Sequence, residues 1–448
     1  PRIHGGLLGR RGIDDEEMSR HDINPIDLVA VNLYPFAQTI EQETCTREDA
    51  IENIDIGGPS MIRAAAKNHD SVTVIVSQSD YDRVASEIEN SGGVSQITRS
   101  ELAAKAFSHT AQYDGMISNY LTLDPEDGLP QMLNLQYEKA QTMRYGENPH
   151  QQAGFYPDSQ AVGLGAATVL DGGKELSYNN WLDLDGAVAA VNDLPSPSAV
   201  VVKHTNPCGA ALSSDSPCDA LEKAWEGDPL SAFGSVVAVN GHFDLSCAKF
   251  MGGPNKFVEV LAAPSFDAEA VEFLRNGPKW GKNLRIVQIS DIGCKRNQLE
   301  SRRVWGGNLV QGSDDISAFD ADLQVAGEVA LDPSLENDAR LAQVLVKHLK
   351  SNAICLVKDS RLVGAGAGQM SRVDSAEIAV KKAGDRAKGS VVGSDAFFPF
   401  PDGPQALAEA GAIVIVQPGG SMRDAEVTAE CDKNKVCMVH TGTRHFKH

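Results

Sequence analysis

The chain has 448 residues, of which 42% are hydrophobic and 23% charged, a composition typical of globular proteins with several domains. Its formal net charge of -21 argues against general affinity for nucleic acids or anionic membranes, although a local basic pocket for phosphate is compatible with it. The eight cysteines are scattered without a C-x-x-C pair, which indicates neither a zinc ribbon nor a disulfide framework.

The chain ends and apolar runs bear on localisation. No apolar run approaches the ~18 residues of a membrane-spanning helix, and no charged start leads into an apolar signal core. We therefore expect a cytoplasmic protein without a metal site. Residues 1–6 contain no methionine and no leading strand, so we expect the chain to begin inside a domain.

The first third alternates strands and helices. Residues 26–36 predict a strand that ends at Pro35, with Tyr34 at its tip. The elements expected next are a strand over 71–77, a helix capped by Ser79 and ended by Gly92, a helix over 101–121 and a polar linker over 124–131.

A glycine turn precedes one helix of this third. Residues 57–59 are Gly-Gly-Pro, and the helix-forming run 61–68 follows. Such a turn before a helix N-terminus offers backbone donors to an anion, and a simple helix cap is the alternative.

A β-branched run over 200–202 ends in two ionisable side chains, Lys203 and His204. Short apolar runs of this kind predict buried strands of a parallel sheet, whose ends carry functional residues. A histidine titrates near neutrality and an adjacent ammonium disfavours its protonated form. The pair therefore predicts a neutral general base beside a fixed cation, and a loop with two solvated polar residues is the alternative.

Other polar groups occur on both sides of this strand. Residues 143–151 are rich in polar and turn-forming types, and their Arg144 suits a phosphate, although a solvated loop is the default interpretation. Glu259 is an isolated carboxylate in the predicted strand 257–263, where it is costly unless it binds something. The other elements expected here are a helix ending near 193, a helix from Ser216 to Gly227 and a strand over 235–239.

The last third repeats the alternation. Ser334 predicts the start of a helix on which His348 is a core-edge residue rather than a ligand. The glycine-rich run 364–372 matches neither a P-loop nor G-x-G-x-x-G. The aromatic run 394–402 suits either a core or the wall of a site for a flat heterocycle. Strands are expected over 353–357, 413–416 and 436–440, and a frayed polar tail after them.

Twelve short motifs occur together in one order along the chain. They are N-L-Y-P-F, N-I-D-I-G-G, A-A-A-K-N-H, R-Y-G-E-N-P-H-Q, L-S-Y-N-N, K-H-x-N-P-C-G, D-P-x-S-A-F-G, K-S-N-A-I, G-A-G-Q-M-S-R, S-D-A-F-F-P-F, Q-P-G-G-S and the terminal R-H-F-x-H. In this set and order the chain resembles the bifunctional purine-biosynthesis family, bacterial type, that joins AICAR transformylase to IMP cyclohydrolase.

The resemblance implies an α/β fold with two domains. Residues 1–123 would form an incomplete cyclohydrolase domain, doubly wound and methylglyoxal-synthase-like, and 124–131 a linker. Residues 132–448 would form the transformylase, with two similar cytidine-deaminase-like three-layer α/β/α subdomains. The resemblance further implies a homodimer with transformylase sites across the interface.

The implied transformylase reaction moves a formyl group from the co-substrate 10-formyltetrahydrofolate to AICAR. Lys203 and His204 match the family's catalytic pair, with Asn352 as their helper. The residues that match nucleotide contacts are Arg144, Tyr145, Phe233, Gly234, Glu259 and Arg372, and those around the folate are Phe398, Phe400, Asp402 and Arg444.

The implied cyclohydrolase reaction closes formyl-AICAR to IMP. Tyr34, Asp55 and Lys67 match residues of that site. Because the family's opening βαβ half, with its phosphate turn and a lysine, has no counterpart here, we expect formyl transfer without efficient ring closure.

The implied deaminase-like fold raises a zinc deaminase as one alternative. That activity needs H-x-E with P-C-x-x-C, and neither pattern occurs, so the sequence argues against it. A non-catalytic protein that binds purine nucleotides is the alternative from another functional class.

Overall fold

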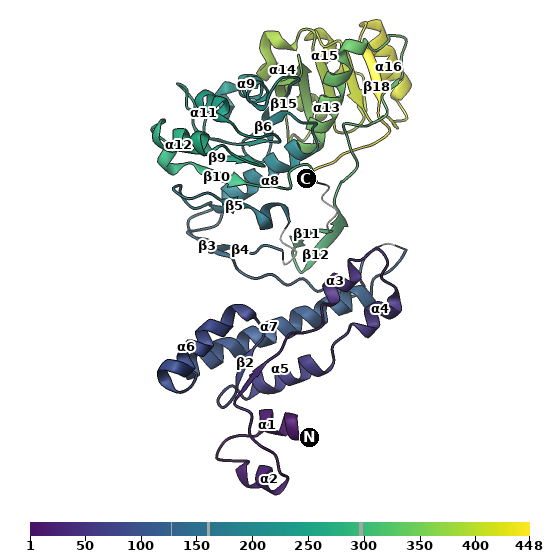
Figure 1. Ribbon diagram of the computed structural model, residues 1–448. Coiled ribbons are helices and arrows are strands. Elements are labelled where there is room, and N and C mark those ends of the chain that lie inside the picture. Colours follow the sequence, from purple (N-terminus) through teal and green to yellow (C-terminus); the bar gives the residue numbers. More distant parts are fainter. Residues whose placement is uncertain (127, 159–161, 295–298) are drawn as a thin grey trace. The chain divides into compact units, whose positions relative to one another are not determined.

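The computed structural model describes residues 1–126, 128–158, 162–294 and 299–448, which form two compact units, Pro1–Tyr137 and Glu138–His448 (Figure 1). Asp127, within the predicted linker, lies outside the described residues. In these ranges, no helix combines the length and the apolar character needed to cross a membrane.

The N-terminal unit (Pro1–Tyr137) packs its helices around a two-stranded parallel sheet. Leu28 of β1 pairs with Thr73 of β2, and the core beneath includes Ile62, Val74 and Ala106. Its elements are α1 Arg2–Leu8, α2 Asp15–Arg20, β1 Leu28–Ala30, α3 Phe36–Ile40, α4 Arg47–Glu52, α5 Gly57–Lys67, β2 Thr73–Ile75, η1 Gln78–Asp80, α6 Tyr81–Ser91 and α7 Gln96–Leu121.

Several boundaries in this unit differ from the predicted ones. The strand expected over 26–36 is short, because only 28–30 pair with β2. Helix α7 begins at Gln96, because the Ser95 hydroxyl accepts a hydrogen bond from the backbone N–H of Thr98. Ser77 rather than Ser79 caps the turn before α6, whereas Gly92 ends α6 in the left-handed conformation, as predicted.

The glycines before the predicted helix 61–68 lie inside α5. The carboxylate of Asp55 accepts the backbone N–H of Gly58 at 2.7 Å, which starts the helix at Gly57. A Cβ at Gly58 would lie 2.6 Å from Leu33 Cδ2 and 2.7 Å from Asp55 Oδ2, so a larger residue there would have to displace these two side chains. The expected glycine turn is therefore the first turn of a helix.

The C-terminal unit (Glu138–His448) contains one large sheet and two separate hairpins. Its strands are β3 Gln141–Met143, β4 Ala153–Phe155, β5 Thr168–Val169, β6 Ser198–Val202, β7 Pro207–Leu212, β8 Ser235–Val239, β9 Val258–Ala263, β10 Arg285–Gln288, β11 Leu299–Val304, β12 Gly307–Gly312, β13 Gln324–Val325, β14 Ile354–Lys358, β15 Arg361–Gly366, β16 Val391–Ser394, β17 Val414–Gln417 and β18 Cys437–His440.

Helices cover both faces of this sheet. They are α8 Tyr178–Asn192, α9 Pro217–Gly227, α10 Pro229–Ala232, α11 Leu245–Met251, α12 Ala268–Asn276, α13 Glu336–His348, α14 Arg372–Ala383, α15 Asp402–Glu409 and α16 Asp424–Lys433, with short 3-10 turns at Gly163–Ala166, Gly281–Asn283, Pro333–Leu335 and Gly384–Ala387. Ser216 caps α9 and Pro217 is its first residue, as predicted.

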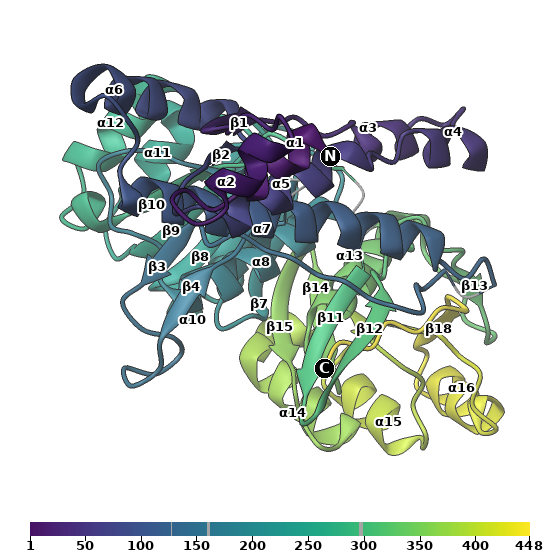
Figure 2. The same cartoon turned by 90° about the horizontal axis from the view of Figure 1, so that it is seen from below.

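The large sheet consists of two halves with the same strand order. From the junction outward, the early half (residues 168–288) runs β7-β6-β8-β9-β10-β5 and the late half (residues 324–440) runs β15-β14-β16-β17-β18-β13. In both, a hairpin joins antiparallel to three parallel strands, and Arg361 of β15 pairs with Ala211 of β7 at the junction. Figure 2 shows the early half in blue to teal and the late half in green to yellow.

The orientation of β6 corrects one expectation. This strand was expected in a parallel sheet, but it pairs antiparallel with both β7 and β8. A strand buried on both faces has the same unbroken apolar sequence in either orientation, so the Val200–Val202 run predicts burial and not direction.

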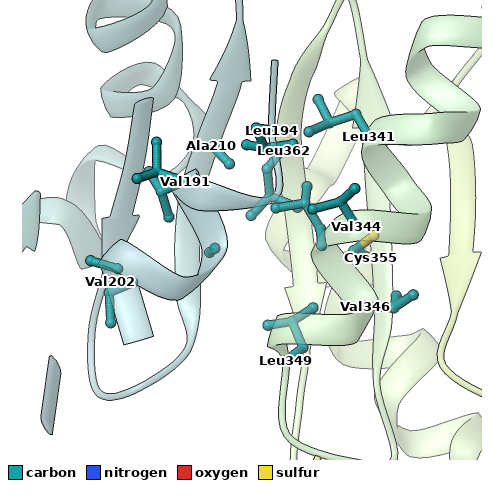
Figure 3. Close-up of a cluster of buried hydrophobic side chains, with 14 of the residues drawn as sticks. Val191, Leu194, Val202, Ala210, Leu341, Val344, Val346, Leu349, Cys355 and Leu362 are labelled. Atoms are coloured by element: carbon teal, nitrogen blue, oxygen red, sulfur yellow. The ribbon is translucent and has the colours of Figure 1, made fainter. Parts of the chain in front are cut away.

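One hydrophobic cluster extends across both halves on the face covered by α8 and α13. It includes Val191 and Leu341 from these helices and Val202 and Cys355 from the strands beneath them (Figure 3). Alternate strand residues, such as Val201 and Leu356, belong to separate clusters on the opposite face, one for each half. The unit is therefore layered as helices, sheet and helices.

In the last third, the structure differs from the prediction at the cap before α13 and at the C-terminal tail, and it shows the environment of His348. Asp332, not Ser334, caps the turn before α13, by accepting the N–H of Ser334. His348 is buried and bonds Asp193 at 2.8 Å. The tail expected to fray is packed instead, because its backbone finds partners: Ser351 N donates to the carbonyl of Lys447 at 2.9 Å.

Candidate active site

Strand register brings distant parts of the sequence to one end of the sheet. Val202 at the end of β6 pairs with Pro207 and with Val236, near the start of β8. In the late half, Ile354 at the start of β14 pairs with the ends of β15 and β16, at Gly366 and Ser394. The antiparallel junction of β7 and β15 then puts these two groups of strand ends on the same side.

A tight turn after β6 carries the two residues singled out in the sequence. Lys203 N donates to the carbonyl of Asn206 at 3.0 Å, and Thr205 has a φ of 54°. The buried Asp183 carboxylate of α8 accepts the N–H of Thr205 at 2.6 Å. The Lys203–His204 and Ser351–Asn352 peptide bonds are both cis. The turn leaves the His204 side chain exposed at the sheet end.

Two carboxylates near this turn, those of Asp183 and Glu259, have hydrogen-bond partners within the protein. Burial raises the pKa of Asp183, against the opposing effects of the Thr205 hydrogen bond and the His204 charge. Glu259 accepts a hydrogen bond from Asn180 Nδ2 at 3.0 Å and lies 3.5 Å from Arg285. The carboxylate that looked isolated in the sequence therefore has two protein partners.

One side chain ties this turn to the late half. Asn206 Nδ2 donates to the carbonyl of His204 at 2.9 Å, and its Oδ1 accepts the N–H of Lys350 at 2.9 Å. Since Lys350 is two residues before Asn352, the turn and the Lys350–Asn352 segment lie side by side.

Arg372 and Asp395 hold Asn352 in place. Arg372, at the start of α14, donates to Asn352 Oδ1 at 3.0 Å, to Ser394 Oγ at 3.0 Å and to Asp395. Asp395 also accepts the Ser351 hydroxyl at 2.5 Å and the Ala353 N–H at 3.1 Å. The sequence reasoning missed Asp395, and its only local signal was an acid directly after a buried strand.

The Phe233–Gly234 segment contacts the turn from the start of β8. Lys203 Nζ donates to the carbonyl of Phe233 at 2.5 Å. Gly234 has a φ of +77°, and a Cβ there would lie 3.5 Å from Lys203 Nζ and from the Phe257 ring. The Phe233 ring is half-exposed with its centroid 5.5 Å from that of Phe257, so a flat aromatic surface borders the ammonium group.

Arg144 and Tyr145 lie in the loop of the β3–β4 hairpin. Their side chains contact each other, with the guanidinium carbon 4.8 Å from the ring centroid. The hairpin is anchored on α8, where the Phe155 and Trp181 rings stack at 4.0 Å.

The expected folate residues fall into two groups. Phe398 is buried in the core of the late half, and its N–H donates to Gln417 at 2.8 Å. This burial corrects the expectation that Phe398 faces a ligand. Phe400, Asp402 and Arg444 are exposed, with Phe400 beneath Arg423 and Arg444 above the Phe446 ring.

The three residues expected to close the ring lie in the N-terminal unit. Tyr34 is 56% exposed, and the Asp55 carboxylate is engaged with the start of α5. Lys67 is the last residue of the same helix, which at 1.5 Å per residue places it roughly 16 Å from the first turn. The helix thus separates Asp55 and Lys67.

A cavity of about 990 Å³ in the C-terminal unit lies elsewhere, between the β11–β12 hairpin, the ends of α8 and α13 and the last three residues. None of the predicted site residues lines it. In the described part of the chain, no three His, Cys, Asp or Glu side chains gather closely enough to hold a metal ion.

A family model and curated relatives agree on one family for this chain. The family model described as AICARFT/IMPCHase bienzyme matches residues 65–382. Proteins called bifunctional purine biosynthesis protein PurH are 47% identical in Rhodopirellula baltica (strain DSM 10527 / NCIMB 13988 / SH1), 48% in Thermoanaerobacter sp. (strain X514) and 46% in Bacillus subtilis (strain 168). Each match covers 100% of this chain and 86%, 87% and 87% of those proteins, respectively.

The crystal structure of ForH is 36% identical over 26% of this chain and 61% of that one, but its TM-score of 0.23 is too low for a structural argument. The sequence relatives carry the assignment instead, because the identity extends over nearly their full length. The chain belongs to the AICARFT/IMPCHase bienzyme family of purine biosynthesis.

Proposed function

We propose that the C-terminal unit transfers the formyl group of 10-formyltetrahydrofolate to the 5-amino group of AICAR, giving formyl-AICAR and tetrahydrofolate. The observation that carries this proposal is the bridge by Asn206, which joins the Lys203–His204 turn to the segment that ends in Asn352. A base, a cation and an amide are then within one small region, as formyl transfer to a weak nucleophile requires.

His204 acts as the general base. The AICAR amine is a poor nucleophile, because its lone pair is delocalised toward the carboxamide. Removing its proton during attack on the formyl carbon is therefore valuable, and help of this kind typically contributes ~10²–10⁴-fold. Exposure of His204 at the sheet end gives the substrate access to its ring. The C–N bond to the folate then breaks, and the folate nitrogen takes up a proton.

Lys203 and Asn352 stabilise the oxygen that becomes negative in the tetrahedral intermediate. Lys203 is already oriented by the Phe233 carbonyl, and the amide of Asn352 by Arg372 and the carbonyl of Gln369. Groups oriented in advance toward developing charge need little reorganisation as the reaction proceeds.

The substrate contacts follow the family resemblance, with one change. Phe400, Asp402 and Arg444 are assigned to the folate, and Phe398 is left out because it is buried. The nucleotide is assigned to Arg144, Tyr145, Phe233, Gly234, Glu259 and Arg372, of which Arg372 is buried and bonds Asn352. We further propose a homodimer. Tyr34, Asp55 and Lys67 of the N-terminal unit match the family's ring-closing residues, but we expect formyl-AICAR to accumulate rather than close efficiently to IMP.

The test is a formyl-transfer assay with AICAR and 10-formyltetrahydrofolate, in which chromatography separates formyl-AICAR from IMP. We expect formyl-AICAR to form at a rate proportional to protein. Nucleotide binding without turnover would overturn the proposal and support a non-catalytic binding protein. IMP above the spontaneous background would assign ring closure to this chain as well.

A further inference from the structure

The two ends of helix α14 contact the two halves of the sheet. Arg372, its first residue, bonds Asn352 and Asp395 of the late half. Lys382, near its last residue, bonds Asp228 and Ser231 of the early half. At 1.5 Å per residue these attachment points are roughly 15 Å apart along the axis, a separation that a regular helix holds fixed.

The contact at Lys382 is partly shielded from solvent. Lys382 Nζ lies 2.9 Å from Asp228 Oδ2 and 3.0 Å from Ser231 Oγ. The Asp228 side chain is 17% exposed, although that of Lys382 is 43% exposed. Burial would raise the pKa of Asp228, but hydrogen bonds from Ser231 and Lys382 outweigh it and hold that pKa below its usual range. Fully exposed ion pairs contribute little, so this shielding and the shared hydroxyl matter.

Asp228 fixes the segment that orients Lys203. Its carboxylate accepts the N–H of Ser231 at 3.1 Å and so starts the short helix α10, which leads directly into Phe233. The Phe233 carbonyl accepts the Lys203 ammonium, and Gly234 N donates to the carbonyl of Phe257 at 2.7 Å. A path of direct contacts thus runs from Lys382 through Asp228 and Phe233 to Lys203.

A second contact strengthens this attachment. Arg386, just after α14, donates to the carbonyls of Gly227 at 2.7 Å and Glu226 at 3.0 Å. The residues directly before Asp228 are therefore also held from the late half.

We propose that Lys382 and Asp228 are positioning residues for formyl transfer, which set the Phe233 carbonyl and through it the ammonium group of Lys203 relative to Asn352. This inference rests on the proposed function, and it assigns to α14 the role of a spacer between the two groups that stabilise the oxyanion.

The kinetic test compares three variants of one helix. We expect Lys382→Met to lower kcat ~10-fold with KM for AICAR within about threefold, because a small displacement of a group acts mainly on the chemical step. Lys382→Arg should restore kcat to within about threefold, since it keeps a donor and the charge. Lys381→Met, on the neighbouring exposed lysine, should match the unaltered protein.

The rate of chemical acetylation of Lys203 tests the positioning role independently of formyl transfer. Acetylation of Lys203 by sulfosuccinimidyl acetate, followed by mass spectrometry, reports whether its amine is held by the Phe233 carbonyl. We expect faster acetylation of Lys203 in Lys382→Met than in Lys381→Met, at equal melting temperature.

Equal acetylation rates, or an unchanged kcat in Lys382→Met, would overturn the positioning role. If the unaltered protein forms no formyl-AICAR, the proposed function fails, while the acetylation rates still decide whether Lys382 controls Lys203.

Discussion

The early and late halves of the large sheet share an order of strands but differ in where they place charge. The early half ends β6 in Lys203, which is partly exposed, and His204, which is exposed. At the same end of the sheet, the late half has Arg372 and Asp395, whose side chains are 7% and 0% exposed. The repeated architecture therefore carries reactive groups in one half and a buried ion pair in the other.

This difference suggests that the two halves have different roles in catalysis. An exposed histidine can exchange a proton with a substrate, whereas a buried and paired arginine mainly fixes its neighbours. Arg372 fixes Asn352, and Asn206 ties the early turn to the same segment. We infer that the late half provides the framework on which the early half performs proton transfer.

The largest effect is expected from Asp395→Asn, which leaves the Arg372 charge buried without its partner. Breaking a buried pair in this way costs about 3–5 kcal/mol of unfolding free energy. Urea denaturation measures it, with Asp385→Asn, on a fully exposed side chain in the same half, as the control within about 0.5 kcal/mol. A loss no larger than that of the control would mean that the late half is not a framework of this kind.

In contrast to Asp395→Asn, His204→Ala should leave the unfolding free energy unchanged and lower turnover. We expect kcat to fall ~10²-fold, equivalent to about 2.7 kcal/mol, with AICAR binding largely unchanged, because a general base acts on the chemical step. Calorimetry and single-turnover formylation measure the two quantities. His242→Ala, on another exposed histidine of the early half, is the control. Turnover within a factor of a few of the unaltered protein would remove His204 from the mechanism.

The halves also meet at the ends of α8 and α13, where His348 bonds Asp193. Burial lowers the pKa of His348 to about 4 from its ordinary 6.5, although Asp193 opposes the shift. Between these pH values the unfolded chain binds a proton that the folded one does not, so stability falls as pH falls from 6.5 to 4. Over the two pH units from 6.5 to 4.5, the change in unfolding free energy is on the order of 2 kcal/mol.

His348→Gln should flatten that part of the stability curve, since the amide cannot titrate. The carboxylate of Asp193, whose pKa is held near 2 by His348 and Lys347 against burial, loses its own contribution only below pH 3.8 and so outside this window. Urea melts at pH 6.5 and 4.5 measure the slope, with His242→Gln as the control. Equal slopes in both variants would show that His348 is not the group responsible.

Local sequence patterns predicted several ends of helices and strands, but not the direction in which distant strands pair. The Lys203–His204 strand end, the Ser216 cap and the Gly92 stop follow from neighbouring residues and are observed. The antiparallel direction of β6 could not be predicted, because burial on both faces produces the same valine run in either direction.

Whether a given side chain is buried or exposed was harder to predict from the sequence than the strand directions. Phe398 and Phe400 are two residues apart in one aromatic run, yet one is core and the other exposed, which depends on how the following helix packs. The pairing of Arg372 with Asp395 joins residues 23 positions apart, so no local window contains it. Apart from Lys203 and His204, the site residues were predicted chiefly from the family resemblance and not from local sequence patterns.

The smallest effect is expected at Asn206, whose side chain joins the turn to the late half. Asn206→Ala removes both of its hydrogen bonds and leaves the Lys350 N–H without its acceptor, which should cost about 1 kcal/mol of unfolding free energy. If the late half positions the turn, kcat should also fall, by ~10-fold, because His204 and Asn352 lose their fixed separation. Asn206→Asp is the matched variant, since a carboxylate still accepts from Lys350 but cannot donate to the His204 carbonyl. We expect it to keep kcat within about threefold, given that the acceptor side carries the tie between the halves. Equal loss of kcat in the two variants would assign the effect to the bond within the turn, and the early half would then order its own catalytic groups without help from the late half.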